Sequence, residues 1–168
     1  QFEFVYGPLS IYGNIIFREV KADEICIDKN NCDKNIYARN CDILSTLVLD
    51  NKIKGEVRSS QNYKTIRLEV KDNTVSTQFR HTVEENHKLE QLSVSGGSYG
   101  HGFQVGSVDG KSAVDIVSVL ATNITEGIFT FSNLDIAQIK ISGTSVKSSL
   151  IFDKINLGFL SIKSFFNY

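Results

Sequence analysis

Three polar residues in the C-terminal third, Asp115, Asp135 and Asn156, are the first candidates for chemistry. Each directly precedes a group of apolar residues, and they lie 20 and 21 residues apart (115 to 135, then 135 to 156). If the groups are stacked strands, these side chains lie about 4.8 Å apart on one outer surface. Carboxylates at that spacing can share a proton, bind a cation or divide acid and base roles. A solvated outer column is the simpler alternative, so we predict a binding surface and assign no catalytic residue.

Histidines and cysteines are the other candidate ligands. The two sets are His81, His87 and His101, and Cys26, Cys32 and Cys41. A His-x5-His spacing lacks the i, i+4 geometry of a helical zinc site, and no cysteine is near it in sequence. We therefore expect solvated loop histidines, no metal site and no cofactor. Three cysteines fit one disulfide plus a spare thiol in a secreted chain, or three buried or reduced thiols, and both alternatives stay open.

An internal repeat indicates the elements that position these residues. The segment from Phe131 to Ile141 aligns with the segment from Phe152 to Ile162 at an offset of 21 residues. A template of the form apolar-x-x-apolar-x-apolar recurs along the chain, and repeats of about this length are typical of solenoids. The template occurs at Ala22/Ile25/Ile27, Leu44/Leu47/Leu49, Thr65/Leu68/Val70, Leu89/Leu92/Val94, Ile116/Val119/Ala121, Ile136/Ile139/Ile141 and Leu157/Leu160/Ile162.

Composition predicts one globular domain over residues 1–168, since 41% of its residues are hydrophobic and 22% are charged. We expect residues 1–21 to form an N-terminal cap over the open end of the solenoid and residues 22–168 to form the coils. A net charge of −1 argues against general electrostatic binding to nucleic acid or to an anionic membrane. No apolar run approaches a membrane span, so no membrane insertion is expected. The start at Gln1 and the absence of Met suggest a processed chain or a fragment.

Two repeat families are similar to parts of the sequence. The segment from Thr65 to Val75, with Asn73 bonding the turn, resembles a leucine-rich repeat, as do Ala22–Cys32 with Asn30 and Ile136–Val146 with Thr144. On that resemblance, the return segment from Val75 to Glu85 is a potential helix. The C-terminal half resembles a parallel β-helix instead, because the strand-like Ile128–Asn133 leaves no room for a helix. We predict an all-β, parallel β-helix-like solenoid of about seven coils. The first alternative is a leucine-rich-repeat α/β solenoid, and the second is a β-sandwich.

A non-enzymatic binding or adhesion module is the function that this pattern favours. We expect it to be secreted or at the cell surface, to recognise a protein or glycan, and to belong to a larger assembly, because solenoids present extended faces. Pectin-cleaving β-helix enzymes place acidic residues on adjacent coils, so that resemblance implies a polysaccharide lyase or hydrolase using Asp115 and Asp135 as one alternative. The leucine-rich-repeat resemblance implies a recognition module of immunity or signalling as the other.

Overall fold

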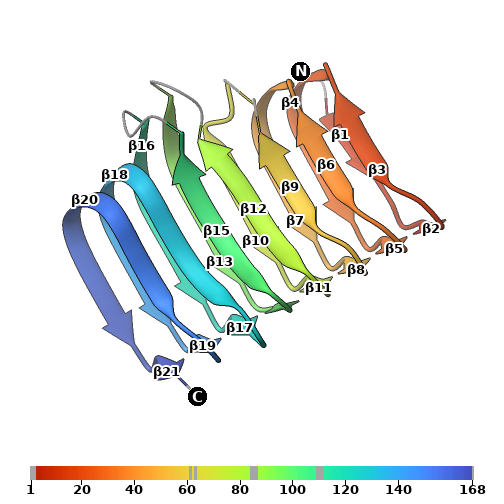
Figure 1. The fold of residues 1–168 in the computed structure, drawn as a ribbon. Coiled ribbons are helices and arrows are strands. Elements are labelled where there is room, and N and C mark those ends of the chain that lie inside the picture. The colour runs from red at the N-terminus through yellow and green to blue at the C-terminus, as the bar shows by residue number, and fades with distance from the viewer. Residues whose placement is uncertain (1–2, 61, 63, 84–86, 109–111, 168) are drawn as a thin grey trace.

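The chain winds into a stack of coils, and each coil contributes strands to the walls of the stack (Figure 1). The computed structural model describes residues 3–60, 62, 64–83, 87–108 and 112–167, and no helix is present in these ranges. Each complete coil runs through a longer strand, a two-residue strand and another longer strand. Each strand pairs in parallel with the equivalent strand of the neighbouring coil, so the ladders run along the stack.

Three walls result, and we number them in the order in which each coil visits them. Wall 1 contains β1 (Glu3–Tyr6), β4 (Lys21–Asp28), β7 (Asp42–Leu49), β10 (Arg67–Lys71), β13 (Lys88–Ser95), β16 (Ser112–Leu120) and the second parts of β18 (Ile128–Ser142) and β20 (Leu150–Lys163). Wall 2 contains β2 (Ser10–Ile11), β5 (Asn31–Cys32), β8 (Lys52–Ile53), β11 (Thr74–Val75), β14 (Ser98–Tyr99), β17 (Asn123–Ile124), β19 (Ser145–Val146) and β21 (Phe166–Asn167). Wall 3 contains β3 (Ile15–Arg18), β6 (Ile36–Arg39), β9 (Val57–Ser60), β12 (Gln78–Val83), β15 (Gly102–Ser107) and the first parts of β18 and β20.

This architecture confirms the predicted all-β parallel solenoid of about seven coils. The leucine-rich-repeat alternative is not supported, because the return segments are strands. In the expected helical segment from Val75 to Glu85, β12 runs from Gln78 to Val83, and Glu84 and Glu85 lie outside the described residues. The predicted N-terminal cap is not confirmed either. Its strands β1, β2 and β3 continue the parallel register of β4, β5 and β6, so these residues form a first coil.

Alternating side chains fill the interior of the stack. In β4, Ile25 and Ile27 point inward and are buried, as the repeat template predicts. Two of the seven templates are wrong. In β7, where the second template lies, Ile43, Thr46 and Val48 are buried and Leu44 is 41% exposed. In β16, where the fifth template lies, Val114, Val117 and Val119 are buried and Ile116 is 43% exposed. Both segments offer two apolar registers, and the parallel ladder with the neighbouring coils selects one.

Aromatic rings stack on the inner side of wall 3. The rings of Phe79 and Phe103 are nearly parallel, with centroids 4.5 Å apart. Phe129 meets Phe103 edge-on at 5.2 Å, and Tyr99 approaches from wall 2 at 5.3 Å. All four side chains are fully buried, so this column is a large part of the hydrophobic core.

Buried polar residues form the corner between walls 1 and 2. In six of these corners, a residue with positive φ is followed by a small or amide residue. The residues with positive φ are Lys29, Asp50, Asp72, Gly96, Ala121 and Gly143. The next residues include Asn30, Asn51 and Asn73, and each of these amides donates to backbone carbonyls in the turn. The sequence did not reveal Asn51, because the template of that coil was placed one residue too late.

No described segment forms a helix with the length and apolar character that crossing a membrane requires.

Candidate functional site

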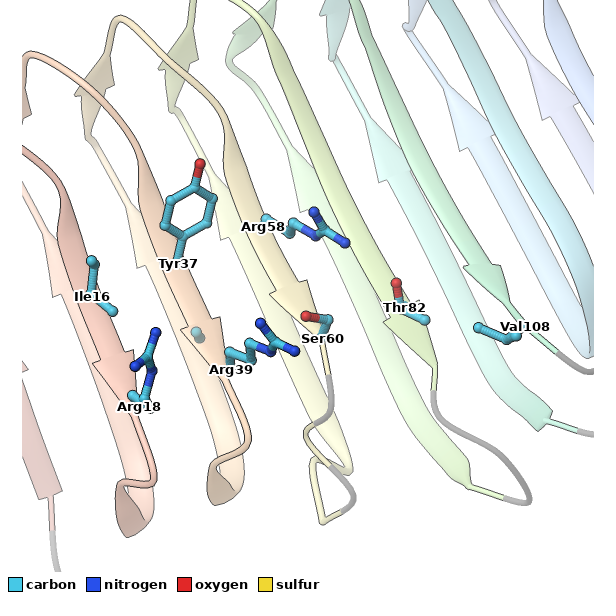
Figure 2. Close-up of a pocket in the computed structure, with 9 residues that line it drawn as sticks. Ile16, Arg18, Tyr37, Arg39, Arg58, Ser60, Thr82 and Val108 are labelled. Atoms are coloured by element: carbon cyan, nitrogen blue, oxygen red, sulfur yellow. The ribbon is translucent and has the colours of Figure 1, made fainter.

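The outer side of wall 3 carries a depression lined by basic side chains, which we call the arginine groove (Figure 2). It has a volume of about 520 Å³. Its lining residues come from five successive strands of the wall or from the chain directly after them, and Figure 2 shows their side chains standing on the ribbon. The lining is formed by Ile16, Arg18, Tyr37, Ala38, Arg39, Arg58, Ser60, Thr82 and Val108.

Four of the five arginines in the sequence face outward from wall 3. They are contributed one per strand by four neighbouring strands, as Arg18 in β3, Arg39 in β6, Arg58 in β9 and Arg80 in β12. The fifth, Arg67, lies on β10 in wall 1. The alternation of each strand explains the orientation, because the residues flanking each arginine within its strand are buried.

Strand register divides these arginines between two adjacent columns. Arg18 is paired in register with Arg39, and Arg58 with Arg80. Tyr37 pairs with Arg58, so the aromatic ring stands beside a guanidinium in the same column. Ser60 pairs with Arg39 in the other column, where it adds a hydroxyl group next to the charged head.

Most of the positive charge in the groove is not engaged in ion pairs. Among the described residues, the salt bridges of lysines and of His101 with carboxylates do not involve Arg18, Arg58 or Arg80. Arg80 is not among the lining residues but pairs in register with the lining residue Arg58. Its Nη2 donates at 3.3 Å to Oε1 of Gln78, which is a neutral acceptor. Guanidinium groups whose charge is not neutralised by a carboxylate are suited to binding oxyanions.

The phenol of Tyr37 is a neutral member of the groove. Burial raises the pKa of Tyr37, and the nearby Glu56 carboxylate raises it further, so the phenol stays protonated at neutral pH. Its hydroxyl is already hydrogen-bonded to the Glu56 carboxylate, so the face of its ring is what the residue offers to a ligand.

The predicted residues Asp115, Asp135 and Asn156 line a second, shallower depression on wall 1. They do not form the single column that we expected. Asp135 pairs in register with Asn156, whose Nδ2 donates to Oδ1 of Asp135 at 2.7 Å. In β16, however, the partner of Asp135 is Ala113, and Asp115 lies two residues further along the strand. The register error in the fifth template, which falls on β16, therefore displaced Asp115 from its predicted place.

Asp115 has a partner on the preceding coil. Its Oδ2 lies 2.8 Å from Nζ of Lys88, and this hydrogen bond raises the pKa of the lysine. The depression thus holds one ion pair and one carboxylate–amide pair, separated along the strand.

The histidines lie in different surroundings, and the expectation of solvated loop residues is wrong for His81. This residue is inside β12 and only 3% exposed. Burial lowers its pKa to about 4, and the nearby His87 adds to the effect. The ring of His101 is exposed, with Nε2 3.6 Å from a carboxylate oxygen of Glu126. Within the described ranges, no group of three or more histidine, cysteine or acidic side chains could hold a metal ion.

All three cysteines are free thiols. Cys32 and Cys41 are buried and Cys26 is partly buried. Burial raises the pKa of Cys26 and of Cys41, so these thiols stay protonated at neutral pH. Of the two alternatives left open by the sequence, the structure contains the one without a disulfide.

Sequence reasoning missed the arginine groove, although a signal was present. The four arginines of wall 3 are spaced 21, 19 and 22 residues apart, which is close to one coil. A search for charged residues recurring at the repeat period would have placed them on one face.

No family model, curated protein or solved structure matches the chain.

Proposed function

We propose that this solenoid is a non-enzymatic binding module that recognises an anionic partner through the arginine groove. One observation carries the proposal: four successive strands of one wall each present an outward arginine, while the chain as a whole has a net charge of −1. A general excess of positive charge does not account for such a surface. A local binding face does, since exposed loops and faces of rigid scaffolds are where recognition is concentrated.

The chemistry of the groove supports an oxyanion as the recognised group. A guanidinium offers five N–H donors in a planar fork that matches the oxygens of carboxylate, sulfate or phosphate. The ring of Tyr37 adds an apolar surface, and the hydroxyl groups of Ser60 and Thr82 add neutral donors and acceptors. The partner in this proposal is a glycan or protein bearing acidic groups, met outside the cell or on a cell surface, within a larger assembly.

The acidic depression on wall 1 does not enter this proposal. Asp115 is engaged by Lys88, and Asp135 by Asn156. No observation favours a hydrolase or lyase reaction there, so the enzyme alternative is not carried forward.

Equilibrium binding to a panel of polysaccharides tests the proposal. The panel contains a sulfated, a carboxylated and a neutral polymer, and the variants are Arg39→Gln, Arg58→Gln and the control Arg67→Gln on wall 1. We expect binding of an acidic polymer and none of the neutral one. Each groove substitution should weaken affinity about 10-fold, because a hydrogen bond to a charged group contributes roughly 1.5–3 kcal/mol. Equal losses in Arg67→Gln, or no binding of any acidic polymer, would overturn the proposal.

A further inference from the structure

We infer that the ligand of the arginine groove is a linear acidic glycan that lies across the strands and runs along the axis of the stack. This inference rests on the proposed function and adds the class and orientation of the ligand. It comes from the placement of the arginines, from the choice of arginine over lysine, and from the neutral residues between them.

The placement of the arginines sets the orientation. Each of β3, β6, β9 and β12 carries a single arginine, so a ligand lying parallel to one strand meets one guanidinium of that strand. A ligand crossing the strands meets a new guanidinium at every coil. With neighbouring strands about 4.8 Å apart, the four strands cover about 14 Å along the axis. The step from the Arg18–Arg39 column to the Arg58–Arg80 column tilts this path slightly across the wall.

Arginine alone supplies the positive charge on these four strands. The sequence contains thirteen lysines, and none lies in β3, β6, β9 or β12. Lysine acts as a hydrated point charge and serves diffuse attraction well, whereas arginine binds two oxygens of one group in a fixed plane. The groove is therefore suited to binding separate oxyanions at defined positions. A polymer with one acidic group per repeat unit presents oxyanions in this way.

The residues between the arginines distinguish a glycan from a nucleic acid. Single-stranded nucleic acids are bound on aromatic platforms on which successive bases stack. Tyr37 is the one aromatic residue among the described lining residues, and its neighbours in the column are Ile16 and Arg58. Ser60 and Thr82 face the same groove. One aromatic ring, the aliphatic side chains of Ile16, Ala38 and Val108, and two hydroxyl groups suit the mixed apolar and hydroxylated surface of a sugar chain.

Size-defined oligosaccharides test the inference. One arm uses oligogalacturonates, which carry carboxylates, and the other uses sulfated dextran oligosaccharides, both from the monosaccharide to the octasaccharide. The variants Arg18→Gln and Arg80→Gln remove the two ends of the series, with Arg67→Gln as the control. Thermal melting of each variant shows that the fold is retained, and glutamine preserves the aliphatic part of each side chain.

In at least one arm, we expect the affinity per binding site to rise with the length of the oligosaccharide until it reaches from Arg18 to Arg80. Longer oligosaccharides should then bind each site with the same affinity. Long oligomers should lose about 10-fold in affinity in each end variant, while a disaccharide should be affected by at most one of them. The arm with the stronger binding identifies the acidic group.

Two results would overturn the inference and leave the proposed function intact. The first is a charged monosaccharide that binds as tightly as the octasaccharide while remaining sensitive to Arg39→Gln and Arg58→Gln. The second is a single-stranded oligonucleotide of equal charge that binds as tightly as either glycan. The absence of binding to every acidic ligand would overturn both the inference and the proposed function.

Discussion

The amide side chain of Asn51 lies directly next to that of Asn73 inside the corner between walls 1 and 2, with Nδ2 of Asn51 donating to Oδ1 of Asn73 at 2.9 Å. The same oxygen of Asn73 accepts the backbone N–H of Asn51 at 3.0 Å. Asn30 repeats both contacts with Asn51 one coil earlier. A short amide ladder therefore joins three coils and satisfies backbone groups that the turn removes from water.

Replacing Asn51 with alanine should lower the free energy of unfolding by roughly 2–4 kcal/mol, because it leaves buried donors and acceptors without partners. The groups affected include the backbone N–H of Asn30 and the carbonyls of Ile27 and Leu49. Urea denaturation measures the change. The exposed neighbour Asn31 is the matched control, and Asn31→Ala should stay within about 0.5 kcal/mol of the wild type. Equal effects of the two substitutions would contradict a structural role for the ladder.

Phe103 occupies the centre of the aromatic column, in contact with Phe79, Tyr99 and Phe129. Phe103→Ala should destabilise the fold by about 3–5 kcal/mol, because it combines lost burial with a cavity in a closely packed interior. Phe159→Ala is the control, since that ring is 53% exposed on the outside of β20, and it should change stability by less than about 1 kcal/mol. Equilibrium urea unfolding compares the two variants, and a similarly small loss for Phe103→Ala would show that the column is not part of the core.

Gly127 lies where two adjacent coils approach closely. A Cβ at this position would overlap the backbone oxygen of His101, and backbone atoms cannot yield as a flexible side chain can. Gly127→Ala should therefore cost at least about 2 kcal/mol of stability. Gly13→Ala is the matched substitution in open space, because no atom of the described residues, its two chain neighbours aside, lies within 4 Å of the place that its methyl group would take. Thermal melting compares the two, and similar melting temperatures would contradict the close approach.

His81 should make stability depend on pH. Its pKa is about 4 in the folded chain and about 6.5 when exposed, so the unfolded chain binds the proton more readily between these values. The contribution of His81 to the free energy of unfolding is therefore fully present above about pH 6.5 and is lost as the pH falls toward about 4. The total loss is about 3 kcal/mol. Urea unfolding at a series of pH values measures this dependence.

Two variants separate His81 from the other titrating groups. His81→Val should flatten the pH dependence in that window, since Val105 fills the same register position on the next coil. His101→Gln, on an exposed side chain, should leave it unchanged. If stability still depended steeply on pH in His81→Val, other titrating groups would be responsible for that dependence.

Much of the fold could be predicted because the inward columns repeat in the sequence. One parallel ladder in wall 1 places apolar residues of different coils in equivalent positions, as it does for Ile25, Leu68, Leu92 and Ile139. The register failed where two apolar residues compete, as with Ile43 beside Leu44. Single-sequence periodicity contains no information on which of them pairs with the neighbouring coil.

The site was harder to predict, because outward residues are not constrained by packing. Asp115 and Asp135 shared a template position in the sequence, yet the ladder separates them by two residues. The arginines of wall 3 were overlooked because the template followed wall 1 alone. Their significance depends on which strands become neighbours, and only the three-dimensional order of the strands shows that.

Backbone chemical-shift mapping distinguishes the outer side of wall 3 from every other face as the binding surface. The titration adds the acidic polysaccharide that binds most tightly to isotopically labelled chain and follows every assigned amide. We predict that the largest shifts cluster at residues 16–18, 37–39, 58–60 and 80–82, and that Arg39→Gln together with Arg58→Gln removes them. Shifts centred on Arg67 and the neighbouring strands of wall 1, or no shifts at saturating ligand, would contradict binding at the arginine groove.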